Sequence, residues 1–219
     1  MNYFDAHLHV VSPPLLLQAQ TKGVRKFIVN ATTLDDWHKI DLLRKNILGV
    51  YSCYGVHPWY VDTAPDDWSI QLEQRLKNDP WAMVGEIGLD KLRPHYARQK
   101  EFFLRQLQLA QKYTRAVHIH CVHAWDDVLT FLNEFRELSI LFHRFSGNEI
   151  IVQKCRFLNA YFSVLNGAAV RVIPDNRLLV ESDAPDGLKS PDQIPDLVHR
   201  LQLDPDYLNQ NFDRFFYDR

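Results

Sequence analysis

Short runs rich in β-branched and aromatic residues alternate along this chain with segments of helical periodicity. Such runs are typical of β-strands, and apolar residues spaced three or four apart are typical of helices. The predicted strands are residues 3–10, 25–31, 48–56, 82–87, 116–121, 139–145, 160–165 and 177–181. The predicted helices are residues 15–20, 34–45, 66–77, 96–113, 125–136, 149–155, 191–201 and 206–216. This alternation limits the possible folds more than any other feature of the sequence.

Strands separated by helices predict parallel pairing, because parallel strands need crossover connections. Eight such units predict an α/β fold of the closed (β/α)8 TIM type. Only residues 167–176 separate the seventh and eighth strands, which leaves room for a loop or a single turn. We therefore expect a compressed barrel. The alternative is an open doubly wound sheet, but no Gly-x-Gly-x-x-Gly motif follows the first strand.

No repeat or linker interrupts the 219 residues, so we expect a single barrel domain over residues 1–219. The net charge of −2 argues against a broadly basic nucleic-acid-binding surface, although it allows a local patch. Three irregularly spaced cysteines predict neither a disulfide framework nor a CxxC metal site. We expect no export signal and no membrane span, and hence a cytoplasmic protein without a membrane partner.

Residues that can bind a metal stand late in the predicted strands. His7 and His9 lie two positions apart, so on a strand both project from one face. The carboxyl ends of barrel strands converge on one mouth, where active sites lie. The candidates at this mouth are His7, His9, Glu86, His120, His143 and Asp183. Together they would hold one or two divalent ions.

Each candidate alone also has an ordinary structural explanation. Glu86 and Asp183 could be turn acids, and His120 could be a core histidine, as we expect for His118 one layer deeper on the same face. The combination of six potential metal ligands at one mouth favours a metal site. Imidazole suits zinc or manganese, and carboxylates also admit magnesium. A carboxylate such as Glu86 can bridge two ions about 3.5–4 Å apart, which activate water and clamp a phosphate or amide oxygen.

Several sequence blocks resemble those of the TatD-like metal-dependent deoxyribonucleases, a branch of the amidohydrolase-type barrels. The blocks are FDAHLH from Phe4, GVHP from Gly55, GEIGLD from Gly85, residues 116–120, HRFSG from His143 and ESDAP from Glu181. Gln99 and Phe102 fit the family's following helix, and Asn211, Phe212 and Phe215 fit its C-terminal ending. The resemblance therefore covers the whole chain.

The resemblance implies a metal-dependent hydrolase that cleaves phosphodiester bonds, with DNA as the substrate. It implies that the six candidates are metal ligands. Glu86 and Asp183 would be the catalytic residues, and Asp183 would take the proton of the attacking water. His57 would lie near the phosphate of the substrate.

The chain departs from the family pattern at three positions. Val122 stands where the family usually has an arginine, Arg144 stands in place of a cysteine, and Ser182 replaces a threonine. We expect Arg144 or His123 to replace the lost charge, and therefore name Arg144 with His57 as substrate-binding residues. Further candidate phosphate contacts near the mouth are Lys91, Arg93, His95, Arg98 and Lys189.

Two other functions stay open. The same activated water could attack an amide or an ester, including an aminoacyl ester, and the missing arginine and the slightly acidic charge are compatible with such a substrate. A binding or scaffolding protein on a barrel that has lost its activity is the third hypothesis. The presence of all six candidate ligands argues against it. The sequence names no protein partner.

Overall fold

The computed structural model describes residues 1–217 and contains eight parallel strands that pair in chain order. The strands are β1 (Tyr3–Leu8), β2 (Val24–Asn30), β3 (Val50–Tyr54), β4 (Met83–Asp90), β5 (Val117–Val122), β6 (Ser139–Phe142), β7 (Asn159–Val164) and β8 (Leu178–Val180). Sequential order and parallel pairing exclude the open doubly wound alternative, in which the order reverses.

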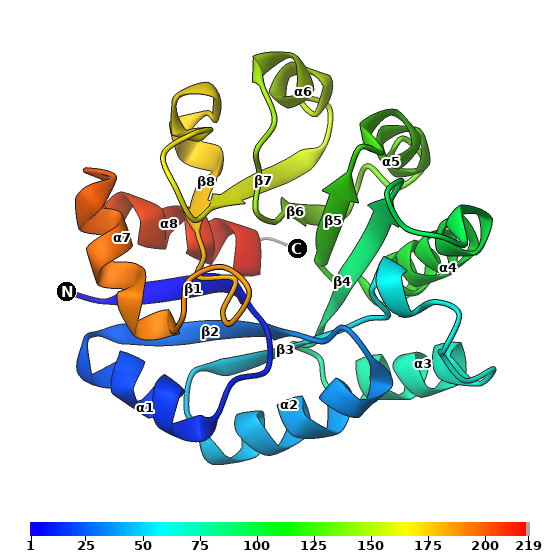
Figure 1. The fold of residues 1–219 in the computed structure, drawn as a ribbon, viewed down its shortest axis with the longest axis horizontal. Coiled ribbons are helices and arrows are strands. Elements are labelled where there is room, and N and C mark those ends of the chain that lie inside the picture. Colours follow the sequence, from blue (N-terminus) through cyan, green and yellow to red (C-terminus); the bar gives the residue numbers. More distant parts are fainter. Residues whose placement is uncertain (218–219) are drawn as a thin grey trace.

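Helices form an outer ring around these strands (Figure 1). They are α1 (Pro13–Thr21), α2 (Leu34–Asn46), α3 (Trp68–Asn78), α4 (Tyr96–Tyr113), α5 (Trp125–Leu132), α6 (Glu149–Lys154), α7 (Ile194–Arg200) and α8 (Pro205–Tyr217). Short 3₁₀ turns add η1 (Pro58–Tyr60), η2 (Val170–Val172), η3 (Asp175–Arg177) and η4 (Pro191–Gln193). None of the helices of the described chain combines the length and apolarity that crossing a bilayer requires.

The connection between β7 and β8 consists of η2 and η3 and lacks an α-helix. The predicted compressed (β/α)8 barrel is confirmed. Some predicted bounds were too long. The pairing of β6 with β7 ends at Phe142 opposite Phe162, and two residues later Arg144 takes a left-handed φ of 46°, so the sixth strand cannot continue to residue 145.

The barrel closes between β1 and β8 by a small set of hydrogen bonds just beyond the end of β8. The backbone N–H of Asp183 donates to the His7 carbonyl at 2.9 Å, and the N–H of His9 donates to the Ala184 carbonyl at 2.9 Å. The buried Asp5 carboxylate accepts from the Ser182 N–H at 2.9 Å and from the Ser182 hydroxyl at 2.5 Å. Within residues 1–217, no regular ladder pairs β1 with β8.

Helix α8 packs against β1 and β8 and buries the C-terminal aromatic residues. The ring of Phe212 lies 4.4 Å from that of Phe4, and Phe215 is fully buried. The amide of Asn211 donates to the carbonyls of Asp175 at 2.7 Å and Leu178 at 3.0 Å. The C-terminal segment therefore supports the strands on both sides of the closure.

Candidate metal centre

All six predicted ligands come together at the carboxyl ends of the strands. His7 lies in β1, Glu86 in β4 and His120 in β5, whereas His9, His143 and Asp183 lie one to three residues beyond β1, β6 and β8. A cavity of about 650 Å³ opens at this mouth. Its lining includes His9, His57, Glu86, His120, His143, Arg144 and Asp183. The expected convergence of these side chains is therefore present.

Close approach of β4 to β5 positions two of these ligands. Gly88 pairs with His120 and has a φ of +148°, a conformation that side chains with a Cβ rarely adopt. A Cβ at Gly88 would lie 1.9 Å from the His120 carbonyl oxygen. The glycine after Glu86 and Ile87 is thus a steric requirement for bringing His120 next to Glu86.

The Glu86 carboxylate is the hub of the site. Both of its oxygens face imidazole nitrogens. The distances are 3.3 Å to His7 Nε2 and 3.4 Å to His9 Nε2 from Oε2, and 3.1 Å to His57 Nε2, 2.8 Å to His120 Nδ1 and 2.8 Å to His143 Nε2 from Oε1. The two sets adjoin, because the rings of His7 and His143 stack with their centres 4.0 Å apart. Each oxygen of one buried carboxylate therefore has its own nitrogen donors, as a bridging ligand requires.

Asp183 completes the first of these groups. Its Oδ1 lies 3.4 Å from His9 Nε2, and ligand atoms of His7, His9 and Asp183 all lie within 4.8 Å of one another. Ligand atoms of His57, Glu86 and His120 form a second compact set. Nitrogen and carboxylate oxygen are the donors preferred by zinc and manganese.

An unpaired buried atom at the hub also fits a metal site. Among the described residues, His7 Nε2 is buried without a hydrogen-bond partner and faces Glu86 Oε2 at 3.3 Å. Buried polar atoms in proteins almost always have such a partner. Burial opposes ionisation of Glu86, but the charges of His143 and His57 and hydrogen bonds with His120 and His143 hold its pKa well below its usual range. The hub is therefore an anion surrounded by imidazoles.

The histidines differ in their protonation. Burial lowers the pKa of His7 to about 3 and that of His57 to about 4. Burial acts in the same direction on His9, but its hydrogen bond with Asp183 and the charge of Glu86 outweigh it and raise the pKa of His9 to about 9. Contacts with Glu86 likewise outweigh burial and raise the pKa of His120. Metal binding at neutral pH must therefore displace a proton from His9.

Sequence reasoning gave no role to three acids that the structure places behind the ligands. Asp5 closes the barrel next to His7, Asp90 lies 3.5 Å from His120 Nε2, and Glu181 lies 3.8 Å from His143 Nδ1. Each of them is buried and belongs to a sequence block that also holds a ligand. The sequence did contain a signal for them: each is an acidic residue in the same block, at the end of a predicted strand, as a predicted ligand.

Glu181 is enclosed by β7, β8 and the loop after β6. Its carboxylate accepts hydrogen bonds from the Arg144 N–H and the Ser163 hydroxyl, both at 2.5 Å. Burial and the nearby charge of Asp183 raise its pKa well above the usual value. This carboxyl group therefore fixes the backbone that carries His143 and Arg144.

The predicted substrate-binding residues lie at the cavity. His57 contacts the hub directly, and His118 lies deeper, with its Nδ1 3.3 Å from His7 Nδ1. The guanidinium of Arg144 donates to Asp183 Oδ2 at 2.9 Å while its side chain keeps 54% exposure. Among the described residues that line the cavity, Arg144 is the only arginine or lysine.

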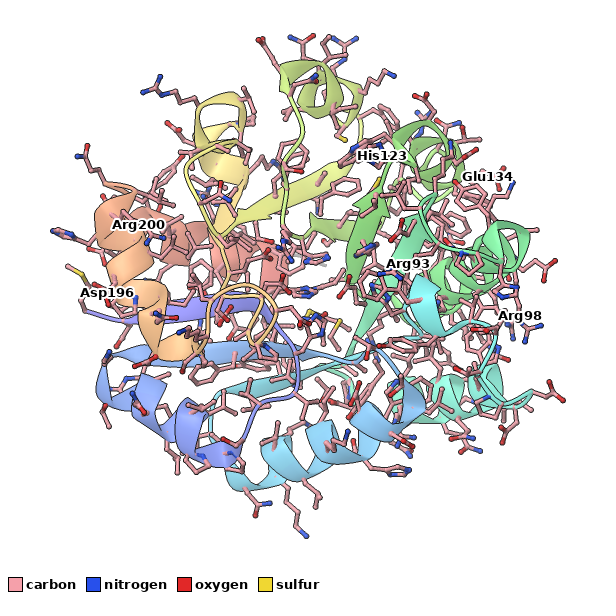
Figure 2. The ribbon with its side chains drawn as sticks, viewed as in Figure 1. Arg93, Arg98, His123, Glu134, Asp196 and Arg200 are labelled. Atoms are coloured by element: carbon pink, nitrogen blue, oxygen red, sulfur yellow. The ribbon has the colours of Figure 1, made fainter. Side chains whose placement is uncertain are left out.

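The other candidate phosphate contacts do not line the cavity. Lys91 pairs with Asp127 at 2.9 Å, and Arg98 donates to the Val61 carbonyl at 2.7 Å. In Figure 2, Arg98 lies at the outer edge of the molecule, His123 lies near α5, and Arg93 lies closer to the mouth beside η1. The guanidinium of Arg93 lies 3.9 Å from the centre of the Trp59 ring.

Comparison with known proteins gives consistent results. The family model described as "TatD related DNase" matches residues 4–213. The uncharacterized metal-dependent hydrolase YjjV of Escherichia coli is 29% identical over 209 residues, covering 84% of this chain and 80% of the relative. The 3'-5' ssDNA/RNA exonuclease TatD of Cronobacter turicensis is 26% identical over 204 residues, covering 83% of this chain and 78% of the relative.

The fold comparison points to the same group. The crystal structure of YjjV, described as a TatD homologue from Escherichia coli, superposes with a TM-score of 0.88 at 26% identity. The match covers 98% of this chain and 97% of that chain. The overall fold therefore agrees over nearly the whole chain.

Proposed function

The chain belongs to the TatD-related DNase family, and we propose that it hydrolyses phosphodiester bonds in DNA with one or two divalent ions held at the mouth of its barrel. It is thus a metal-dependent hydrolase acting on ester bonds. The single observation that carries the proposal is the Glu86 hub, a buried carboxylate whose two oxygens face five imidazoles.

We propose that the ligands divide between the two oxygens of Glu86. His7, His9 and Asp183 belong with Oε2, and His120 and His143 belong with Oε1. Their nitrogen-rich donor set supports zinc or manganese more than magnesium. Divalent ions held by these residues would lower the pKa of water and stabilise charge on phosphate oxygens.

Asp183 is suited to accept a proton. Burial opposes its ionisation, but its hydrogen bond with His9 and the charges of His143 and His7 lower its pKa, so it is a carboxylate at neutral pH. Its φ of 49° is in the left-handed region, and its backbone N–H is tied to His7. The loop thus holds the carboxylate toward the mouth, where we propose that it takes the proton of the attacking water.

We propose that Arg144 and His57 bind the phosphate. Arg144 is the cation on the cavity lining and is within reach of Asp183, and a guanidinium matches the geometry of phosphate oxygens. His57 lies at the hub with a lowered pKa, so it is neutral; its Nδ1 accepts from the Trp59 N–H at 3.2 Å, which leaves its single N–H on Nε2, 3.1 Å from Glu86 Oε1. This N–H would turn to a phosphate oxygen when a metal ion takes up the Glu86 carboxylate. Orientation of the phosphate between these two groups would raise the rate by positioning.

The direct test combines metal analysis with nuclease assays on one preparation. Purified protein should carry or take up one or two zinc or manganese ions and degrade single-stranded DNA. Removal of the ions with a chelator should abolish degradation, and the Asp183→Asn protein should be at least about 100-fold slower. Unchanged digestion by the Asp183→Asn protein would contradict the assigned role of this residue.

A second candidate is hydrolysis of an amide or ester, including an aminoacyl ester. The cavity lining supports it, because among the described residues Asp36, Asp183 and Asp186 accompany only one arginine, Arg144, and no lysine. Side-by-side assays on oligonucleotides, small amides and small esters discriminate the two. Inactivity on all nucleic acids together with turnover of a small ester or amide would favour the second candidate.

We further propose that residues 1–219 act as one catalytic domain in the cytoplasm. Among the described residues, Cys53, Cys121 and Cys155 form no disulfide, which is compatible with a reducing compartment. Cell fractionation with detection of the native protein tests this location.

A further inference from the structure

Trp59 is an exposed aromatic residue that is held rigidly at the mouth. It lies in η1, two residues after His57, and lines the cavity with 44% of its surface exposed. Its indole N–H donates to Asp90 Oδ2 at 2.7 Å. The ring of His57 meets it edge-on, with ring centres 5.1 Å apart. A fixed, half-exposed indole at the rim of a cavity presents a flat apolar surface to whatever enters the cavity.

Arg93 supports this ring. Its guanidinium lies 3.9 Å from the ring centre, within the range of a cation–π contact. Neighbouring cations are engaged elsewhere, since Lys91 pairs with Asp127 and Arg98 with the Val61 carbonyl. No carboxylate of the described residues forms an ion pair with Arg93, so its charge stays available at the rim.

The position of Trp59 relative to the hub gives the third argument. Its ring centre lies 6.1 Å from that of His120, which contacts Glu86. Tyr60, with 38% exposure, continues the aromatic lining of the same wall. Arg144 lies elsewhere on the lining, on the loop after β6. A phosphate at the hub would therefore have a flat aromatic surface close by for the group attached to it.

We infer that Trp59, supported by Arg93, is a stacking platform for a nucleobase of single-stranded nucleic acid beside the metal centre. This inference rests on the proposed nuclease function. A base in a duplex is already stacked on its neighbours, whereas an unpaired base can stack on an indole regardless of its identity. Because the ring is already fixed by Asp90 and His57, binding costs little side-chain entropy.

The experiment compares two oligonucleotides of equal length, one of thymidines and one of abasic tetrahydrofuran units on the same phosphate backbone. Binding is measured by fluorescence anisotropy with manganese present. Every protein carries Asp183→Asn to prevent cleavage. The readout is the ratio of the two dissociation constants, which cancels any general loss of phosphate affinity.

With Trp59 present, thymidines should bind at least about 10-fold more tightly than abasic units, as expected for stacking of one or more bases. Trp59→Ala should reduce this ratio to about one. Trp59→Phe should keep most of it, because the ring remains while the hydrogen bond to Asp90 is lost. Trp81→Phe changes another half-exposed tryptophan, which precedes β4 at the opposite end of the strand, and should leave the ratio unaltered.

Equal binding of both oligonucleotides with Trp59 present, or a ratio that survives Trp59→Ala, would overturn the platform while leaving nuclease activity intact. If the protein with Asp183 intact degrades no nucleic acid and the Asp183→Asn protein binds neither oligonucleotide, the nuclease function itself fails. Loss of the preference in the Trp59→Phe protein as well would overturn stacking, since the indole N–H would then be the group that matters.

Discussion

Two regions of the mouth hold their side chains by different means. The seam consists of residues on or next to the ends of β1 and β8, namely Asp5, His7, His9, Ser182 and Asp183. The wall consists of residues carried by β4, β5 and the segment after β3, namely His57, Trp59, Glu86, Asp90 and His120. In the wall, β4 and β5 pair regularly from Ile87 opposite Ile119 to Asp90 opposite Val122. In the seam, backbone hydrogen bonds at Asp183 and His9 and the Asp5 carboxylate replace a ladder.

Predicted metal ligands of the two regions therefore differ in whether they also help to hold the barrel together. Side chains of the wall stand on a scaffold that exists without them, so a change there should affect the site and spare the fold. Side chains of the seam both present ligands and close the barrel. A change there should affect activity and stability together. The comparison leads to four predictions.

The largest effect is expected from Glu86→Gln in the wall. Loss of the bridging charge should lower metal content and reduce kcat for DNA by about 100- to 10,000-fold, because the amide is uncharged and offers one oxygen donor in place of two. Elemental analysis and single-turnover cleavage measure the two quantities. Full metal content with undiminished cleavage would show that Glu86 is not the hub of the active site.

Asp5→Ala in the seam should be the most destabilising change. It leaves the buried Ser182 N–H and hydroxyl without their acceptor, at a cost of about 2–4 kcal/mol. Each kcal/mol corresponds to a fall in Tm of about 2–4 °C for a chain of this size. Thermal unfolding of metal-free protein measures it, with Ser139→Ala at the far end of β6 as a control. A Tm within 2 °C of wild type would contradict the distinction between seam and wall.

Asp90→Asn should affect the site without affecting the fold. The second oxygen of Asp90 contacts His120 Nε2 and the indole of Trp59, while its first oxygen accepts from the Leu92 N–H at 2.8 Å. An asparagine can keep the latter bond. Partners that orient a metal-binding histidine are worth about 10- to 100-fold in metal affinity. Competition with a chromogenic chelator measures this affinity, and an unfolding free energy lowered by more than about 1 kcal/mol would show that the wall is not independent.

The smallest effect is the pH dependence of stability in metal-free protein. The folded pKa of His57, about 4, lies below its usual value of 6.5, so the stability it contributes is present above 6.5 and is lost as the pH falls toward 4. The folded pKa of His9, about 9, lies above 6.5, so its contribution is present below 6.5 and is lost as the pH rises through 9.

Urea unfolding between pH 4 and 10 with a chelator tests both directions. His57→Gln in the wall should flatten the acidic side of the stability profile, and His9→Gln in the seam should flatten the alkaline side. The opposite assignment, or a profile that neither variant changes, would contradict the electrostatics described above.

Much of the architecture could be predicted from the sequence because it depends on local pattern. Runs of β-branched and aromatic residues predicted eight strands, and the short stretch between residues 165 and 177 predicted that no α-helix joins the last two. The structure has the eight strands, and its described residues form no α-helix between β7 and β8. His7, His9, Glu86 and Asp183 could be named because ligand types at strand ends converge in any barrel of this kind. Their roles as ligands stay a proposal. Strand ends were harder to predict, since pairing partners far along the chain decide where a ladder stops.

The sequence by itself determined the barrel, its compressed last crossover and the set of side chains that point into its mouth, because periodicity and residue type act over short distances. Only the tertiary structure decided that both oxygens of Glu86 face imidazoles, that Asp5 closes the barrel through Ser182, and that Arg93 lies on Trp59. These contacts join residues on different strands and loops. Their geometry follows from how the strands tilt and approach, which no local pattern encodes.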